Sequence, residues 1–254
     1  MRRKIIAFDL DGTLAESKSP LPDEMSEILD ELLGYFQVCV ISGGKFEQFQ
    51  KQLLANLKAD PIKLEALHLM PTCGTRYYRY DVVKADWQMV YAEDFTEEEK
   101  KQIVAALGEG LDALKYREAK PWGELIEDRG SQVTLSALGQ EAPVDAKEEW
   151  DPDNSKKLKL RNYVAQRIPQ FEVRAGGSTS IDVTKLGIDK AYGMHKLMDI
   201  LEVSKEQILF FGDRLAEGGN DYPVKAMGID SLEVSHWQHT AIALRAVLAT
   251  IERN

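Results

Sequence analysis

The chain is poor in the residues that build disulfide-linked or zinc-containing folds. Its 254 residues include two cysteines, Cys39 and Cys73. It also has four histidines, none of which adjoins a cysteine or carboxylate cluster with metal-ligand spacing: His68, His195, His236 and His239. This scarcity excludes a disulfide framework and a zinc site. We expect Cys39 to be a small core residue of a strand, and none of the histidines to be catalytic.

Excess basic charge and long apolar runs are also missing. The formal net charge is −10 at pH 7, with a pI near 5.0. Nucleic acids and anionic membranes bind basic surfaces, so neither is expected as a partner. No stretch approaches the ~18 apolar residues of a membrane span. Residues 1–4 lead directly into an apolar run, without room for a signal peptide. We therefore expect a soluble, cytoplasmic protein.

The most informative segment is a short apolar run, Ile5 to Phe8, that stops at Asp9 and Asp11 and continues with Gly12-Thr13. Such a run is typical of a buried strand in a parallel sheet. The carboxylates then lie at its carboxyl end, where open α/β sheets bind ligands. Because an unpaired buried carboxylate is costly, a cation is expected beside them. Mg²⁺ suits one or two carboxylates together with a phosphate oxygen.

Other interpretations of this segment fit less well. Asp-Gly-Thr alone is a common turn, and Asp-x-Asp also occurs in nucleotide-sugar transferases. A calcium loop would need further oxygen ligands, a Glu at its twelfth position and a preceding helix, all of which this segment lacks. The strand context therefore favours a metal-assisted phosphate site.

Two further apolar strands also end in polar residues. Val38 to Ile41 is followed by Ser42-Gly43-Gly44, where a phosphate can accept hydrogen bonds from the hydroxyl and from backbone N–H groups. Ile208 to Phe211 is followed by Asp213 and then by Asn220-Asp221. Both stretches place ligand-binding groups where the first strand places its carboxylates.

Lys190 lies at the expected start of a helix that runs to about Leu201. A cation there opposes the helix dipole, so a bound anion explains it better than a solvated face. In order and spacing, these four motifs resemble those of the haloacid dehalogenase superfamily. The resemblance implies Asp9 as nucleophile, Asp11 as general acid and base, and a Mg²⁺ held by Asp9, Asp11 and Asp213. It also implies phosphate ligands and supporting residues: Thr13, Ser42, Gly43 and Lys190 for the phosphate, and Asn220 and Asp221 as support.

The implied chemistry suits these residue types. A carboxylate that attacks phosphorus forms an aspartyl-phosphate and divides one difficult displacement into two easier ones. Mg²⁺ and Lys190 offset charge on the phosphoryl oxygens. Asp11 protonates the leaving oxygen and later deprotonates the incoming hydroxyl.

The spacing of the motifs predicts two domains. The hundred residues from 86 to 185, between the second motif and Lys190, carry none of the four motifs. We expect a doubly wound parallel-sheet core of the Rossmann-like type over residues 1–85 and 186–254, with an inserted α+β cap over residues 86–185. The cap edges are placed near Asp86 and Lys185.

The cap region has the pattern αββαββ. Thr96 to Glu99 is a capping box that opens a helix to about Leu107, and Asn154 to Ile168 is a second periodic stretch. Trp122 to Leu138 and Phe171 to Val183 are predicted hairpins, with turns at Arg129-Gly130 and Gly176-Gly177. This order suits an antiparallel sheet with helices on one face.

Within the superfamily, most of the chain is similar to eukaryotic-type phosphomannomutase. Gly212-Asp213 with Gly218 to Asp221 resembles that family's fourth motif, and Gly176 to Val183 resembles its cap strand. The resemblance implies Ser180 and Asp182 as contacts to the sugar. Arg129 matches the first of three arginines that hold the phosphate distant from the reacting one.

The sequence departs from this family at its charged positions. The second arginine position has Gln140, the third has Lys147, and the arginine expected between Leu14 and Pro20 is Lys18. Gln140 supplies no charge, and lysine lacks the bidentate fork of arginine. Ser42-Gly43-Gly44-Lys45 also replaces the mutase pattern Gly-Gly-Ser-Asp.

These departures favour a Mg²⁺-dependent phosphohydrolase, or phosphatase, that acts on a phosphorylated sugar or a similar small metabolite. A phosphomannomutase-type phosphohexose mutase is the alternative. A non-catalytic binding module on the same scaffold is a remote alternative, since it would be expected to have lost a carboxylate. The interpretation leaves open a homodimer formed through the cap.

Overall fold

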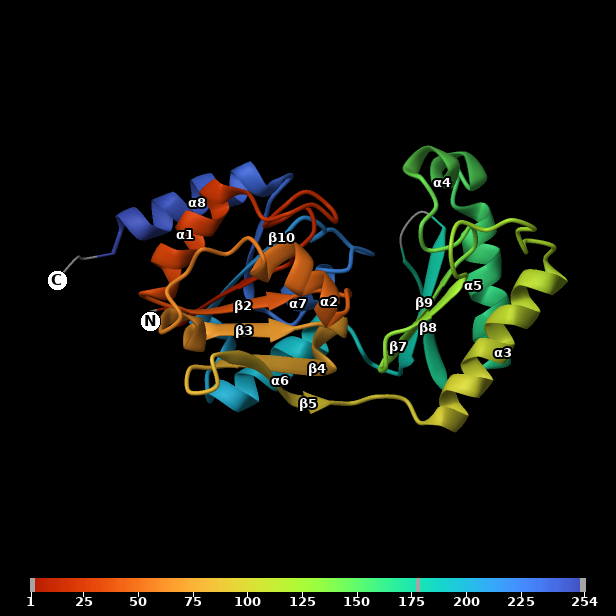
Figure 1. Cartoon of the computed structure of the whole chain (residues 1–254), viewed down its shortest axis with the longest axis horizontal. Helices are drawn as coiled ribbons and strands as arrows, with labels where there is room; N and C mark the ends of the chain where they lie inside the picture. The colour runs from red at the N-terminus through yellow and green to blue at the C-terminus, as the bar shows by residue number, and fades with distance from the viewer. Residues whose placement is uncertain (1–2, 177–178, 252–254) are drawn as a thin grey trace. The chain divides into compact units, whose positions relative to one another are not determined.

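The apolar runs of the sequence form the inner strands of a seven-stranded sheet (Figure 1). In this computed structural model, which describes residues 3–176 and 179–251, the strand order is β11-β10-β1-β2-β3-β4-β5. The strands from β11 to β3 pair in parallel, and β4 and β5 add an antiparallel hairpin at one edge. The strands are β1 (Ile5–Phe8), β2 (Gln37–Ile41), β3 (Leu67–Met70), β4 (Arg76–Asp81), β5 (Asp86–Ala92), β10 (Ile208–Gly212) and β11 (Asp230–Glu233).

Helices cover both faces of this sheet because the strands are apolar on both faces. Ile6 and Phe8 of β1 belong to a cluster with α1 and α8, whereas Ile5 and Ala7 belong to a cluster with α6 and α7. Figure 1 shows α1 and α8 on one side of the sheet and α6 on the other. These helices are α1 (Asp23–Leu33), α6 (Lys190–Leu201), α7 (Tyr222–Ala226) and α8 (Trp237–Ala249). The predicted doubly wound α/β core is confirmed.

Short helical segments occupy several connections of the core. Their bounds are α2 (Phe46–Phe49), the π-helix η1 (Gln50–Leu54), and the 3₁₀ helices η2 (Lys63–Ala66), η3 (Thr72–Gly74) and η4 (Lys205–Gln207). α2 continues directly into η1, so residues 46–54 form one helical segment after β2. This segment follows the second predicted motif.

The inserted region forms a separate antiparallel sheet of order β6-β7-β9-β8. Helices α3 and α5 pack against one face of it through Ile103, Leu107, Leu160 and Val164. Thr96 and Glu99 make the predicted capping box at the start of α3. The elements are α3 (Glu97–Ala113), β6 (Ile126–Asp128), β7 (Gln132–Ser136), α4 (Val144–Trp150), α5 (Ser155–Arg167), β8 (Phe171–Ala175) and β9 (Ser180–Lys185).

The boundaries of the two units differ from those expected. Unit 1 comprises Met1–Ala92 and Asp189–Asn254, and unit 2 comprises Glu93–Ile188. The first edge lies at Glu93, not near Asp86, because β5 pairs with β4 and belongs to the large sheet. The second edge lies a few residues beyond Lys185, after the end of β9.

Three smaller predictions also need correction or qualification. The helix expected to end near Leu107 continues to Ala113, and a short helix, α4, interrupts the expected αββαββ order. Gly177, half of the expected second hairpin turn, lies outside the described residues. Both cysteines are free thiols, and Cys39 is buried as expected. In the described part of the chain, no helix has both the length and the hydropathy that a membrane crossing requires.

Candidate active site

Three adjacent parallel strands bring predicted site residues to one edge of the large sheet. β1 is followed directly by Asp9 and β2 by Ser42, while β10 ends at Gly212, just before Asp213. β1 pairs with both β2 and β10, so the three strand ends are neighbours. The carboxyl edge of a parallel sheet is the usual ligand edge of this architecture.

The first turn of α6 places a buried cation at this edge. The Asp189 side chain caps the helix by accepting a hydrogen bond from the Tyr192 backbone N–H at 3.0 Å. Lys190 follows as the first helical residue and is 1% exposed. Its Nζ lies 2.6 Å from Asp9 Oδ1 and 2.5 Å from Asp221 Oδ1. Two carboxylates therefore compensate the buried ammonium, as a buried charge requires.

These contacts shift the acidity of both partners. Burial raises the pKa of Asp9 to about 7, because the lost hydration and the nearby Asp221 charge outweigh the Lys190 ammonium. Burial alone lowers the pKa of Lys190, but the charges of Asp9 and Asp221 hold it above its ordinary value. Lys190 therefore remains a cation at neutral pH.

Three carboxylates gather tightly enough to hold a metal ion. Ligand oxygens of Asp9, Asp213 and Asp221 lie within 4.8 Å of one another. When all three are ionised, they and Lys190 sum to −2, a charge that a divalent cation offsets. Burial and the Asp221 charge raise the pKa of Asp213. Hard carboxylate oxygens also suit Mg²⁺.

Gly12 makes room for Asp213 beside the first strand. Its φ is +77°, and a Cβ at this position would lie 2.6 Å from Asp213 Oδ2. A side chain at Gly12 would be strained and would also displace the carboxylate. Gly212 does the same for Asp221, since a Cβ there would lie 2.5 Å from Asp221 Oδ2. The two glycines thus allow the carboxylates to approach the strand ends.

The side chain of Asp11 lies in a different environment from that of Asp9. Gln48 Nε2 donates to Asp11 Oδ2 at 2.8 Å, and Gln52 Nε2 donates to Asp11 Oδ1 at 3.0 Å. The Lys18 backbone N–H also donates to Oδ1, at 2.7 Å. Among the described residues, the Asp11 carboxylate is not part of the clustered acids. Its assignment as a metal ligand through that carboxylate stays a prediction.

Sequence analysis missed Gln48 and Gln52. Both come from the helical segment after β2 and are four residues apart, so they lie on one side of it. Gln52 is 4% exposed. The sequence offered no signal for this pair, because the burial that makes an amide need partners is known only from the structure.

The predicted phosphate ligands lie at the same strand ends. Thr13 is buried, and its Oγ1 has no hydrogen-bond partner among the described residues. Such an orphaned hydroxyl is costly unless a ligand uses it. Ser42 is also buried, and its Oγ accepts from the Gly44 N–H at 3.2 Å. Gly43, which lies between Ser42 and Gly44 in the sequence, is partly exposed.

Asn220 and Asp221, the predicted supporting residues, differ in placement. Asp221 is fully buried and accepts the Arg214 backbone N–H at 3.0 Å through Oδ2 while Oδ1 contacts Lys190. Asn220 is exposed, and the described part of the structure shows no hydrogen bond from its side chain to Lys190. Asp221 therefore contacts Lys190 in this geometry, and the supporting role of Asn220 stays a prediction.

Unit 2 carries the predicted cap residues on a polar sheet face. Asp182 pairs with Thr134 across β9 and β7, and its Oδ1 accepts from Thr134 Oγ1 at 2.6 Å. Ser180 pairs with Ser136 on the same strands. Alternate residues of these strands face the helices, so the polar residues line the opposite face.

The remaining cap positions lie outside β7 and β9 in the sequence, although Gln140 contacts β7. Arg129 Nε contacts Glu127 Oε2 at 2.8 Å. Gln140 Nε2 lies 3.5 Å from the Thr134 carbonyl oxygen. Lys147 lies on α4 and is partly exposed. The roles of these side chains in binding a substrate stay predictions.

Comparisons with known proteins agree with the geometry. The profile of the family described as eukaryotic phosphomannomutase matches residues 25–248. The chain is 27% identical to a phosphomannomutase of Encephalitozoon cuniculi over an alignment of 231 residues that covers 87% of this chain and 84% of that protein. It is 27% identical to a phosphomannomutase of Spinacia oleracea over 237 residues, with 87% and 86% covered.

Solved structures support the same fold. An IMP-bound IMP-nucleotidase of Plasmodium falciparum superposes with a TM-score of 0.70 at 17% identity, covering 98% of this chain and 68% of that one. A haloacid dehalogenase-like hydrolase of Bacteroides thetaiotaomicron gives 0.62 at 15% identity, covering 97% and 100%. With the family profile spanning most of the sequence, the chain belongs to the eukaryotic phosphomannomutase family, within the haloacid dehalogenase superfamily.

Proposed function

We propose that the chain is a Mg²⁺-dependent phosphohexose mutase of the phosphomannomutase type. The observation that carries this proposal is the buried Asp9 carboxylate, held 2.6 Å from Lys190 at the edge where Asp213 and Asp221 gather. This arrangement suits an oriented carboxylate nucleophile beside a fixed cation. The names of the relatives add the substrate class, and they favour a mutase over the phosphohydrolase expected from the cap departures.

In the proposed reaction, phosphorylated Asp9 first gives its phosphoryl group to the free 6-hydroxyl of a hexose 1-phosphate. The bond from phosphorus to Asp9 Oδ breaks, a bond from phosphorus to the sugar oxygen forms, and Asp11 takes the hydroxyl proton. In the second half-reaction, Asp9 Oδ attacks phosphorus of the 1-phosphate of the resulting bisphosphate, the bond from phosphorus to the sugar oxygen breaks, and Asp11 gives its proton to that oxygen. The hexose 6-phosphate leaves, and phosphorylated Asp9 and ionised Asp11 are both regenerated.

The other residues bind and orient. Lys190 attracts the phosphoryl oxygens, and Asp221 holds Lys190 in place at 2.5 Å. The orphaned Thr13 hydroxyl and the Ser42 hydroxyl supply hydrogen bonds to the same group. Mg²⁺, when bound by Asp9 and Asp213, would neutralise charge on the phosphoryl oxygens.

A phosphohydrolase is the second candidate, and Gln140 is the observation that favours it. Its amide adds no charge at a position where the family resemblance implies an arginine. A phosphatase needs no firm hold on a second phosphate, whereas a mutase does. In a phosphatase, water would take the phosphoryl group from Asp9.

One experiment separates these candidates. Hexose 1-phosphates would be incubated with the protein and Mg²⁺, with and without a catalytic amount of a hexose 1,6-bisphosphate, and followed by ³¹P NMR. A mutase yields the 6-phosphate, with bisphosphate stimulation, and little inorganic phosphate. Release of phosphate without isomerisation would establish the hydrolase instead. Full activity in the presence of EDTA would contradict the metal assignment.

A further inference from the structure

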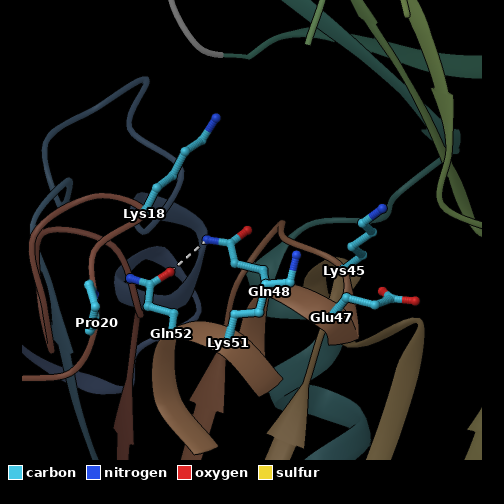
Figure 2. A pocket seen from close by; sticks show the side chains of 7 residues that line it. All are labelled: Lys18, Pro20, Lys45, Glu47, Gln48, Lys51 and Gln52. Carbon is cyan, nitrogen blue, oxygen red and sulfur yellow. Dashed lines mark hydrogen bonds between the residues drawn. The ribbon is translucent and has the colours of Figure 1, made fainter. Parts of the chain in front are cut away.

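The loop after β1 is held in place by two segments that are distant from it in sequence. Gln48 and Gln52 donate to Asp11, and their amides also bond to each other (Figure 2). Further along the loop, the Thr13 carbonyl oxygen accepts from Thr240 Oγ1 at 2.7 Å. Thr240 belongs to α8, 227 positions away from Thr13. The last helix of the chain therefore takes part in shaping the loop.

The peptide group between Thr13 and Leu14 is held at both of its polar atoms. Its carbonyl oxygen accepts from Thr240, and its N–H donates to the Leu10 carbonyl oxygen at 3.0 Å. Because a peptide group is planar, these two bonds together set its orientation. Removing the Thr240 hydroxyl would take away one of the two restraints.

The contact between α8 and the loop lies in the core of unit 1. Thr13 and Thr240 are both fully buried. Leu10 and Leu14 of the loop belong to the same apolar cluster as Leu244, one turn after Thr240 in α8. A buried carbonyl needs a hydrogen-bond partner, and the low local dielectric strengthens the bond that it makes. Packing and hydrogen bonding therefore join the helix and the loop at the same place.

Thr13 is the residue through which this contact reaches the reaction. Its buried Oγ1 has no hydrogen-bond partner among the described residues, and the proposed function assigns this hydroxyl to the phosphoryl group. The Thr13 side chain branches at Cβ and has few rotamers, so the direction of Oγ1 follows from the backbone beside it. A donor that stabilises a transition state must be oriented before the reaction begins.

We propose that Thr240 is a positioning residue for phosphoryl transfer. It acts through Thr13, by holding the peptide group after Thr13 so that the Thr13 hydroxyl points at the phosphoryl group on Asp9. Thr240 does not itself touch the substrate, so its hydroxyl affects the rate of transfer more than substrate binding. This role rests on the proposed function, and it applies to hydrolysis as well as to isomerisation, because both reactions pass through transfer at Asp9.

Steady-state kinetics with a hexose 1-phosphate and Mg²⁺ test this role, with isomerisation and phosphate release both counted as turnover. Thr240→Val keeps the shape of the side chain and removes its hydroxyl. We expect kcat to fall about tenfold while KM stays within about twofold. Thr240→Ser, which keeps the hydroxyl, should restore kcat to within about threefold of wild type.

Thr250→Val is the matched control. It removes a threonine hydroxyl at the end of the same helix, where Thr250 Oγ1 donates to the Val247 carbonyl oxygen at 2.7 Å and not to the loop. This variant should keep the wild-type kcat.

A second background shows whether the effect passes through Thr13. Thr13→Val removes the hydroxyl that Thr240 positions. In that background, Thr240→Val should lower kcat by no more than about a further twofold, because the two losses are then not additive. A merely structural role of Thr240 would lower kcat by the same factor in both backgrounds.

Orthovanadate binding, measured by calorimetry with Mg²⁺, requires no turnover. Orthovanadate can take up five ligands, as phosphorus does under attack, and it therefore resembles the transition state. Its Kd should rise about tenfold in Thr240→Val and stay within about twofold of wild type in Thr250→Val. A chain that shows this pattern without turning over a hexose phosphate would keep the role of Thr240 and lose the proposed function. An unchanged Kd in Thr240→Val would contradict the role.

Four kinetic outcomes would also overturn it: a kcat of Thr240→Val within twofold of wild type, a loss that Thr240→Ser does not restore, an equal loss in Thr250→Val, or an undiminished loss in the Thr13→Val background. Thermal unfolding checks that each variant is folded. If Thr240→Val is not, Thr240→Cys replaces it, because a thiol is a weaker donor of similar size. Its kcat should fall about threefold, and a wild-type kcat there would overturn the role.

Discussion

Asp9 and Asp11 are two residues apart, yet their side chains have different partners. Asp9 is buried against an ammonium group at 2.6 Å. Asp11 accepts from two amides and one backbone N–H. Two carboxylates in contrasting surroundings can take different roles in one reaction. This contrast supports Asp9 as the nucleophile and Asp11 as the group that moves protons.

Substitution of the nucleophile should abolish turnover without unfolding the protein. Asn at position 9 has the shape of Asp but cannot attack phosphorus, and Lys190 keeps its contact to Asp221. We expect Asp9→Asn to lower the rate of phosphoryl transfer at least a hundredfold in a steady-state assay, with a cooperative thermal unfolding transition retained. Even a tenth of wild-type activity would remove Asp9 from this role.

Gln52 is expected to position Asp11. Gln52→Met keeps the length of the buried side chain but removes its donor to Asp11 Oδ1. We expect kcat to fall about tenfold while KM stays within twofold, since the loss affects the orientation of the acid and not substrate binding. Gln50→Met, an exposed position on the same segment, is the control. Equal effects of the two variants on kcat, or a change confined to KM, would argue for a merely structural role.

Among the secondary-structure elements, the parallel strands and α6 could be predicted from sequence because their signals are local. β1, β2 and β10 are short apolar runs with polar residues at their carboxyl ends, and Asp189 caps α6 just before Lys190. The β4–β5 hairpin was missed because it mixes charged and aromatic residues at a sheet edge. Its second strand, β5, is largely exposed and resembles a linker in sequence. The boundary between core and cap was therefore expected near Asp86.

Contacts between distant segments could not be predicted in the same way. Gln48 reaches Asp11 across 37 residues of sequence, and Lys190 reaches Asp221 across 31. The second contact could be anticipated only because the motif resemblance implied it. The first depends on how the helical segment after β2 packs against the loop after β1, and no local pattern encodes that packing.

The position of α6 depends on a close backbone contact. A Cβ at Gly193 would lie 2.5 Å from Ile41 Cδ1 and 2.7 Å from the Cys73 carbonyl oxygen. Gly193→Ala should therefore push α6 away from the sheet, lower the free energy of unfolding by about 2 kcal/mol in urea denaturation, and reduce activity through Lys190. Gly108→Ala in α3 is the control variant, because an added Cβ there meets no backbone atom.

At Gly108 the nearest heavy atom to an added Cβ is Arg117 Nη2, at 3.5 Å. Alanine there should stabilise the helix by about 0.5–1 kcal/mol, because it reduces the entropy that glycine loses on folding. Gly193→Ala with the same stability as wild type would show that α6 can shift at no cost.

His68 links three strands and makes stability depend on pH. It contacts Gln37 Oε1 of β2 and Tyr77 Oη of β4, both at 2.7 Å. Burial and, to a smaller extent, Arg79 lower the pKa of His68 to about 3. The unfolded chain therefore binds one more proton than the native state between about pH 6.5 and pH 3. The contribution of His68 to the free energy of unfolding is fully present above about pH 6.5, and it declines as the pH falls from 6.5 towards 3.

The expected loss from His68 is about 2 kcal/mol between pH 7 and pH 5. Urea denaturation at pH 7, 6 and 5 measures it, and His68→Asn should show a shallower dependence because Asn does not titrate. The substitution itself costs stability at pH 7, so the comparison is between slopes. The same slope in both proteins would assign the pH dependence to other groups.

At the scale of the whole molecule, charge is distributed unevenly. The chain has a net charge of −10, which repels anionic substrates at long range. Two cationic features of unit 1 oppose this repulsion locally: the buried Lys190, and the surface hollow lined by Lys18, Lys45 and Lys51. A chain that binds sugar phosphates, as we propose, would need such local positive charge.

The balance between isomerisation and hydrolysis is a property of the whole proposed enzyme and not of one residue. It depends on whether the bisphosphorylated hexose stays bound until its second phosphate can react, or leaves Asp9 phosphorylated and open to water. Gln140 contributes no charge to that retention. Gln140→Arg would add a cation able to form a charge-assisted hydrogen bond with phosphate. Because both products form at one active site, their ratio does not depend on the fraction of active protein.

We therefore expect Gln140→Arg to raise the ratio of isomerised to hydrolysed hexose phosphate about fivefold, as ³¹P NMR of a single reaction would show; this corresponds to ~1 kcal/mol of better retention. Gln102→Arg, an exposed position of α3 in the same unit, adds the same charge away from the predicted substrate contacts and should leave the ratio unchanged. An equal rise in both variants would assign the effect to net charge. No rise in Gln140→Arg would mean that this position does not hold the second phosphate.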